Sequence, residues 1–320
     1  MSDRASQDLG ELLAVQAGVV ARRQALAAGL SQEAIRHRLH RGRWQPIYPG
    51  VYAAFTGAAG RPSVLWAAVL RAGPGAVLSH QTAAELDGIH SSRDQGRIHV
   101  TVPTARHIEP GHDLAVHRSG RIAAARHPAR QPPRTRIEET LIDLTQTVPT
   151  FDQAFEWLCR GCGGRLTTPA HVLAAMSLRP QLRWRADLAA ALGEVKLGVQ
   201  SNLELRYVRG VERAHCLPRA TRQVKASSNG RLIYRDILYK DYGVAVETDG
   251  EASHPEAARW RDIGRDNAAA ASGLVTLRYS WADITSHPCM VAAEVAAVLA
   301  AHSWRGSARP CKAGCPVGTP

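Results

Sequence analysis

The chain has 320 residues, of which 45% are hydrophobic and 21% are charged, and its formal net charge is +12. This composition allows folded cores and excludes an intrinsically disordered chain, and the length predicts roughly two or three domains. No apolar run is long enough to span a membrane, no secretory signal opens the sequence, and six cysteines are too few for a disulfide framework. We therefore expect a cytoplasmic protein without a membrane partner. The positive charge favours an anionic partner, with nucleic acid ahead of lipid.

Residues 9–56 show the element order of a winged helix-turn-helix. Apolar residues at helical spacing predict helices at the start of this segment, and Ser31 is a suitable N-cap for a further helix that ends at Gly42. Aromatic-rich segments on either side of Pro49 and Gly50, a turn dipeptide, then predict a hairpin. Helix, turn, helix and hairpin together predict a DNA-binding domain.

Basic side chains gather on the second helix of this pair and just beyond it. They are Arg36, His37, Arg38, His40, Arg41 and Arg43. Basic residues on a recognition helix and a wing neutralise phosphates and reach base edges, although a solvated surface is the ordinary alternative for an arginine-rich helix. The helix pair resembles the winged-helix domain of abortive-infection (type IV) toxin–antitoxin antitoxins. This resemblance implies repression of the protein's own operon, DNA as a partner, and a cognate toxin as a further candidate partner.

Residues 57–150 form a mixed α/β middle region, and residues 151–200 a helical connector. Alternating apolar residues predict a strand at 97–103, with 113–119 as its partner. Residues 57–150 contain no set of carboxylates, cysteines or histidines at ligand spacing, so we expect this region to be scaffold. Its histidines are interpreted as separate core or surface residues. They are His80, His90, His99, His107, His112 and His117.

Two cysteine pairs raise a zinc hypothesis that we set below the alternatives. Cys159 and Cys162 stand at ligand spacing, but a structural zinc site needs four ligands. Cys311 and Cys315 are the only other pair, and they fall in residues 303–320, which we expect to be a disordered tail, like residues 1–8.

Residues 201–302 change to an α/β pattern. The predicted elements are a helix from Ser201, strands near 231–239 and 243–249, a helix across 256–271, a strand at 274–280 and a helix from Pro288. Together with the preceding segments they predict a multidomain α+β protein that ends in an α/β domain.

Acidic residues end the buried strand near 243–249. Glu247 and Asp249 stand two apart and so project to one face, and Asp236 lies on the strand before them. Three carboxylates at one edge are suitable ligands for Mg²⁺, which would polarise a phosphate and supply a hydroxide, while His254 could transfer a proton. The alternative is that these acids pair with arginines. The candidates are Arg235, Arg265 and Arg278.

Asp236, the segment VETDG (246–250) and His254 resemble the metal-binding core of the PD-(D/E)XK nuclease superfamily, most closely its very-short-patch-repair branch. The resemblance spans roughly residues 195–300. It implies a restriction-endonuclease-like fold in which Asp236, Glu247 and Asp249 hold Mg²⁺ and His254 lies near the attacking water. Asp249 stands where the superfamily has a lysine, and we expect Arg278 to replace that cation.

Glu204 allows two interpretations. It fits a capping box with Ser201, and nuclease superfamily members also often place a metal-facing Glu on this helix. The overall prediction is a DNA-binding protein with a Mg²⁺-dependent endonuclease domain. The alternative is an antitoxin or repressor whose nuclease-like domain is inactive.

Overall fold

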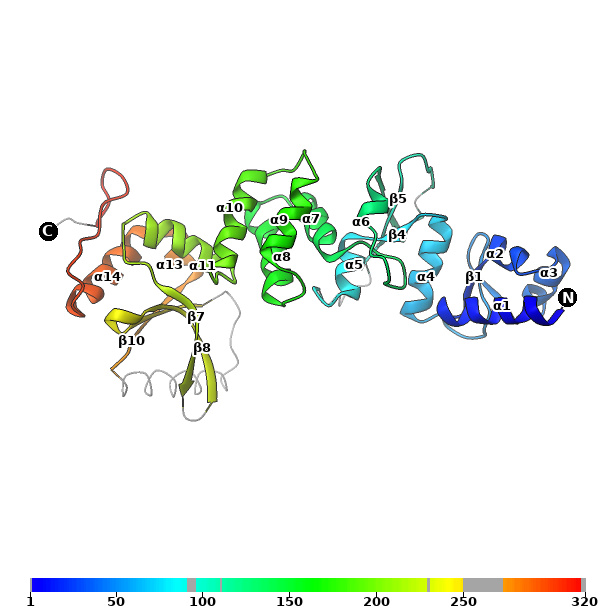
Figure 1. Ribbon diagram of the computed structural model, residues 1–320, viewed down its shortest axis with the longest axis horizontal. Helices are drawn as coiled ribbons and strands as arrows, with labels where there is room; N and C mark the ends of the chain where they lie inside the picture. Colours follow the sequence, from blue (N-terminus) through cyan, green and yellow to red (C-terminus); the bar gives the residue numbers. More distant parts are fainter. Residues whose placement is uncertain (1, 91–95, 110, 229–230, 250–272, 318–320) are drawn as a thin grey trace. The chain divides into compact units, whose positions relative to one another are not determined.

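The computed structural model describes residues 2–90, 96–109, 111–228, 231–249 and 273–317 (Figure 1). The chain forms two compact units, residues 1–149 with 174–180 and residues 150–173 with 181–320. Within the described ranges, every helix falls short of the length and apolar character that a bilayer crossing demands.

The first unit begins with three helices and a three-stranded sheet. The elements are α1 (Ser2–Val15), β1 (Val19–Ala21), α2 (Arg22–Ala27), α3 (Gln32–His40), β2 (Gln45–Tyr48) and β3 (Val51–Ala53). The strands are antiparallel in the order β1-β3-β2. Helix α1 starts at Ser2, although residues 1–8 were expected to be disordered. Ser31 caps α3 as predicted, because its hydroxyl accepts a hydrogen bond from the Ala34 N–H at 3.1 Å.

This sheet is buried on both faces. Val20 and Tyr52, which are register partners, pack with Ile35 against the helices of the helix-turn-helix. Alternation along the strands sends Val19 and Val51 to the opposite face. There they meet Trp66, Ala67 and Leu70 of α4 (Arg61–Ala72). The sheet is therefore a layer between the helix-turn-helix and the middle region.

Helix α4 also belongs to the core of the middle region. Its other face carries Leu65, Ala68, Val69 and Ala72 into a cluster with the second sheet of this unit. The elements of that region are β4 (Val77–Leu78), α5 (His80–Leu86), β5 (Ile98–Pro103), β6 (Leu114–Ser119), α6 (Ile122–Ala125) and α7 (Ile137–Thr147). Strands β5 and β6 pair as expected, in parallel. Since α4 joins both cores, the boundary expected near residue 56 does not separate independent units.

The second unit opens with helices and continues into an α/β layer. Its elements are α8 (Phe151–Gly163), α9 (Pro169–Ser177, which ends in the first unit), α10 (Arg185–Lys196), α11 (Asn202–Arg206), a π-helical turn (Tyr207–Arg213), β7 (Thr221–Ser228), β8 (Arg231–Tyr239), β9 (Val244–Asp249), β10 (Val275–Ser280), α13 (Trp281–Ser286) and α14 (Pro288–Ala301). The helix expected across 256–271 lies outside the described residues.

The sheet of this unit has the order β10-β9-β8-β7. Strands β7, β8 and β9 run antiparallel in sequence, whereas β10 pairs with β9 in parallel. Ile237, Val244 and Val246 are fully buried against Val295 and Leu299 of α14. Each of the three predicted strands is present, because short β-branched runs between turn residues are a strong local signal.

The segment after α14 is ordered up to residue 317, although it was expected to be disordered. Cys315 and Val317 are buried in the core cluster that also contains Leu299. The backbone N–H of Arg309 donates a hydrogen bond to the His215 carbonyl at 2.9 Å. Apolar side chains at the end of this segment therefore hold it on the second unit.

Candidate functional site

The basic residues of α3 and the turn after it are largely exposed. Arg36, His37, His40, Arg41 and Arg43 all lie on the surface. Arg36 pairs with Glu33 at 2.9 Å, but both side chains are more than two-thirds exposed, so water screens this ion pair. The surface that these residues form can approach an anionic backbone without first breaking a buried interaction.

Arg38 differs from the other basic residues of the set. Its guanidinium carbon lies 5.6 Å from the centroid of the Trp44 ring, and its Nη1 donates to the Ala34 carbonyl at 3.4 Å. Trp44 is buried in the core beneath the helix-turn-helix. Arg38 therefore contributes to packing as well as charge, and it is a poor probe of DNA contact on its own.

The hairpin does not extend the basic surface. Residues 45–53 contain no Arg, Lys or His. Ile47, Tyr48 and Val51 pack toward α4, and the Tyr48 hydroxyl donates a short hydrogen bond to the Asp113 carboxylate. Burial, followed by that hydrogen bond, raises the pKa of Tyr48 well above its ordinary value. The expected wing contact is therefore limited to the turn at Arg41 and Arg43.

The acidic residues of the second unit meet different partners. Asp236 on β8 accepts hydrogen bonds from the Thr248 N–H at 3.2 Å and from its hydroxyl at 3.4 Å. Glu247 on β9 forms an ion pair with Arg235 at 3.3 Å, and both side chains are largely buried. The alternative in which an arginine pairs with these acids is therefore confirmed for Glu247, whose partner is Arg235. A long arginine on the adjacent strand reaches it once the strands are in register.

The structure describes three further predicted site residues to different extents. Arg278 on β10 is the direct register partner of Glu247, so the sheet brings the proposed substitute cation beside the acid. Asp249 ends β9 opposite Ser280, but its side chain lies outside the described part of the structure. His254 lies wholly outside it.

Glu204 takes the capping role that the sequence allowed, and its metal-facing role stays a prediction. Its backbone N–H donates to the Ser201 hydroxyl, and its carboxylate accepts from the Gln200 N–H, each at 3.1 Å, which closes the start of α11. The side chain is also buried in the same unit as Asp236. Burial, with a contribution from the negative charge of Asp236, raises the pKa of Glu204 to about 7. The two carboxylates are therefore electrostatic neighbours.

This raised pKa has a consequence for stability. Between the ordinary pKa of 4.5 and the folded-state pKa of about 7, the folded protein retains a proton that the unfolded chain has lost. The stabilisation is present below the ordinary pKa and is lost as pH rises through about 7. We expect Glu204→Gln to remove this pH dependence. Between pH 5 and pH 8 the free energy of unfolding of wild type should therefore fall by on the order of 2–3 kcal/mol more than that of the variant. Urea unfolding at both pH values measures it, and parallel pH profiles would contradict the assignment.

Three histidines of the middle region cluster, which corrects the expectation that they are scattered. The His99 Nδ1 lies 3.0 Å from the His117 Nε2, and the His80 and His117 rings stack at 3.7 Å between centroids. Burial, and then the neighbouring rings, lowers the pKa of His80 to about 2 and that of His99 to about 4. All three imidazoles are consequently neutral near pH 7. Their separate positions in α5, β5 and β6 gave no sequence signal.

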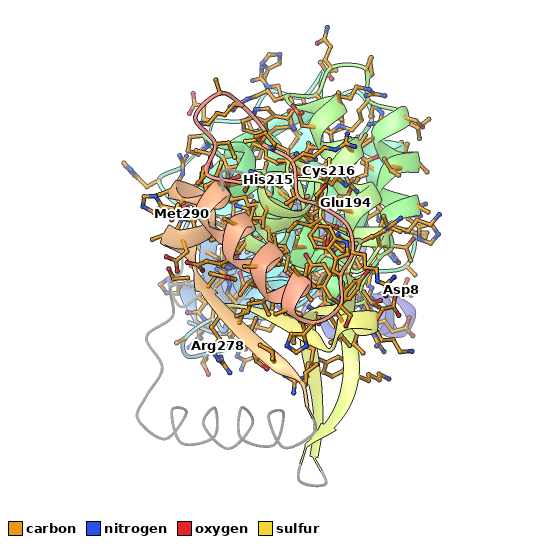
Figure 2. The ribbon with its side chains drawn as sticks, turned by 90° about the vertical axis from the view of Figure 1, so that its left-hand side faces the viewer. Asp8, Glu194, His215, Cys216, Arg278 and Met290 are labelled. Carbon is orange, nitrogen blue, oxygen red and sulfur yellow. The ribbon has the colours of Figure 1, made fainter. Side chains whose placement is uncertain are left out.

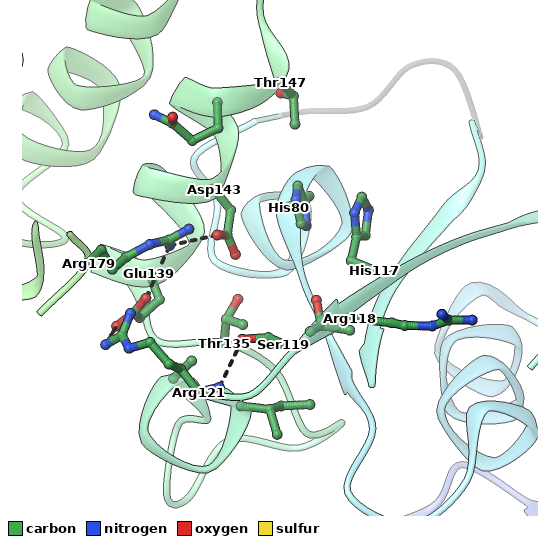
Figure 3. Close-up of a pocket in the computed structure, with 14 residues that line it drawn as sticks. His80, His117, Arg118, Ser119, Arg121, Thr135, Glu139, Asp143, Thr147 and Arg179 are labelled. Carbon is green, nitrogen blue, oxygen red and sulfur yellow. Dashed lines mark hydrogen bonds and ion pairs between the residues drawn. The ribbon is translucent and has the colours of Figure 1, made fainter. Parts of the chain in front are cut away.

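His80 and His117 border a cavity of about 330 Å³ in the first unit. His80 and His117 stand side by side at one wall, and Arg179 reaches the opposite wall, where it bonds Asp143 at 2.7 Å and Glu139 at 3.2 Å (Figure 3). The nitrogens of the cluster could hold a transition metal, because their ligand atoms lie within 4.8 Å of one another. The hydrogen bond between His99 and His117 satisfies two of these nitrogens without one.

The comparisons with known proteins bear on the N-terminal part of the chain. Residues 7–54 match a family model described as a transcriptional regulator, the AbiEi antitoxin. A crystal structure of the RV2827C protein from Mycobacterium tuberculosis is similar over 59% of this chain and 77% of that chain, with 19% sequence identity and a TM-score of 0.37. A search of curated proteins gave no match. The family match supports the predicted antitoxin-like domain and a DNA-binding regulator role for it.

Proposed function

We propose that this protein is a DNA-binding transcriptional regulator of the antitoxin type and that α3 with the following turn is its DNA-contacting surface. The observation that carries this proposal is the exposed basic set on a capped helix inside the segment that matches the regulator family. A recognition helix places its side chains in the major groove, where arginines contact both phosphates and bases.

The packing of the hairpin sheet on α4 indicates how the α3 surface would meet DNA. Because Val19 and Val51 pack on α4, the sheet cannot move away from the middle region without exposing apolar surface to water. The first unit would therefore bind DNA as a rigid body that presents α3. A cognate toxin, as the resemblance implies, would be the second partner of such an antitoxin.

The test is the binding of full-length protein to a labelled duplex, followed by fluorescence anisotropy at several salt concentrations. Phosphate contacts release counterions, so the logarithm of the affinity should fall linearly with the logarithm of the salt concentration, by about 0.9 for each phosphate contacted. A fragment ending near residue 60 is unsuitable, because it would lack the apolar face of α4 that covers the sheet. Binding that does not depend on salt would contradict the proposal.

A second candidate function, endonuclease activity, is favoured by the proximity of Glu204 and Asp236 in the second unit. The strand order with β10 parallel to β9 also supports a restriction-endonuclease-like fold. Glu204 and Asp236 would hold Mg²⁺, with Glu247 and Asp249 as further candidates, although the charge of Glu247 is already shared with Arg235. When bound, the ion would polarise a DNA phosphodiester and supply a hydroxide.

The protein's own residues have definite tasks under this second proposal. Thr248 would hold the Asp236 carboxylate in position through its two hydrogen bonds. Arg278, beside Glu247 in register, would stabilise negative charge that develops on the phosphate. His254 would accept a proton from the attacking water, as the resemblance implies.

The nuclease proposal predicts a metal-dependent gain in stability. If 10 mM Mg²⁺ or Mn²⁺ meets a millimolar site, the free energy of unfolding should rise by about 1.4 kcal/mol in wild type and by nothing in Asp236→Asn. Plasmid nicking by the pure protein should require the metal and should be lost in the same variant. Asp241→Asn, an exposed acid before β9, is the matched control. A wild type that gains nothing from either metal would leave a nuclease-like fold without nuclease chemistry.

A further inference from the structure

A histidine and three cysteines meet beneath the C-terminal segment of the second unit. His215 follows the π-helical turn, Cys289 lies in the first turn of α14, and Cys311 and Cys315 belong to the segment after that helix. The ligand atoms of these four side chains all lie within 4.8 Å of one another. Figure 2 shows the chain after α14 turning back along the helix toward His215.

The spacing of the sulfurs is that of a metal–thiolate site. Sγ of Cys289 lies 3.5 Å from Sγ of Cys311, whereas a disulfide bond would bring the two atoms to about 2.05 Å. Around a tetrahedral zinc ion with Zn–S bonds of about 2.3 Å, two sulfurs stand about 3.8 Å apart. The sulfurs of Cys289 and Cys311 need to move by only a few tenths of an ångström to reach that separation.

His215 is oriented as a zinc ligand requires. It is fully buried, and its Nδ1–H donates a hydrogen bond to the Val211 carbonyl at 3.0 Å. This bond leaves the lone pair on Nε2, and Nε2 is a buried atom without a hydrogen-bond partner of normal geometry in the described part of the chain. Metal-bound histidines usually donate their second nitrogen to a backbone carbonyl in this way, which fixes the ring and its tautomer. A buried imidazole nitrogen left without a hydrogen bond of normal geometry carries a cost that a bound metal ion would remove.

Cys315 is buried, and its sulfur lies among the ligand atoms of the other three residues. The thiolate, not the thiol, is the form that binds a metal, so binding of a metal ion would release the thiol protons.

We propose that His215, Cys289, Cys311 and Cys315 bind one zinc ion that fastens the C-terminal segment to α14. Three thiolates and one imidazole are a ligand set that selects zinc over Mg²⁺ or Ca²⁺. Four protein ligands leave no open position, so the role is structural. The site replaces the zinc hypothesis based on Cys159 and Cys162, which lie on α8 and are not members of this cluster.

The function of this zinc would be to hold an otherwise weakly anchored end of the chain. Between α14 and residue 317 the segment contributes Cys315 and Val317 to the core, with Trp304 and Ala308 partly buried against it. This apolar anchor is small, whereas structural zinc sites contribute directly to folding free energy. The proposal does not depend on DNA binding or on nuclease activity.

The experiment measures metal in the full-length protein purified under reducing conditions. Elemental analysis should find one zinc per chain in wild type and none in the double variant Cys311→Ser/Cys315→Ser. Cys216→Ser is the matched control, because this exposed cysteine follows His215 but lies outside the cluster, and it should retain the zinc. A chelator should lower the melting temperature of wild type and leave that of the double variant unchanged.

A second measurement keeps the proposal testable if the double variant fails to fold. Wild-type protein stripped of metal and supplied with Co²⁺ should develop the thiolate charge-transfer and d–d absorption of a tetrahedral thiolate site. Wild type that contains no zinc, takes up no Co²⁺ and titrates as a Cys289–Cys311 disulfide would overturn the proposal. So would a double variant that retains the full zinc content.

Discussion

Full-length protein carrying Arg41→Glu and Arg43→Glu should bind duplex DNA about 100-fold more weakly than wild type at moderate salt. Both residues are exposed in the turn between α3 and β2, so their replacement removes two phosphate contacts without disturbing the core. The slope of affinity against salt should become shallower by about two units, because each lost phosphate contact removes about 0.9. Fluorescence anisotropy with a labelled duplex measures both quantities.

The control for this variant must change the net charge equally. Arg126→Glu with Arg130→Glu meets that condition, since both residues are exposed in the segment after α6. If the control weakened binding as much as the turn variant did, overall charge and not α3 would be the source of affinity. Arg38→Ala should also flatten the salt dependence by about one unit, but part of its effect would come from lost packing on Trp44.

The largest expected loss of stability comes from Glu212→Ala in the second unit. Glu212 and Arg222 form an ion pair at 2.8 Å, with side chains only 4% and 2% exposed. The Glu212 carboxylate also accepts a hydrogen bond from the Ala220 N–H at 3.2 Å. Removing the acid leaves a buried guanidinium without its counter-charge, which costs about 3–5 kcal/mol. Urea unfolding followed by circular dichroism measures the loss.

A surface ion pair of the same unit provides the comparison. Glu156 and Arg160 pair at 2.7 Å on α8 with both side chains about half exposed, so Glu156→Ala should cost less than about 1 kcal/mol. Replacing both Glu212 and Arg222 by apolar residues of similar volume should recover much of the loss, because no charge is then left buried. Equal costs for Glu212→Ala and Glu156→Ala would show that burial does not control the strength of these pairs.

The sequence by itself determined the elements that depend on local signals. The N-cap at Ser31 and the strands of the second unit follow from neighbouring residues, and the structure contains each of them. The capping role of Glu204 was available from the same kind of pattern. Such signals come from a few successive side chains that act on the backbone nearby. They can therefore be recognised in the sequence without knowledge of the fold.

Only the tertiary structure decided which distant residues meet. No local pattern in the sequence indicated that α4 covers Val19 and Val51. Glu247 pairs with Arg235, and this ion pair depends on the register of β8 and β9. The clusters of His80, His99 and His117, and of His215 with three cysteines, join segments far apart in the chain. Apart from Cys311 and Cys315, their members share no local spacing, because a metal or a cavity requires proximity in space and the folded chain can supply it from any order of residues.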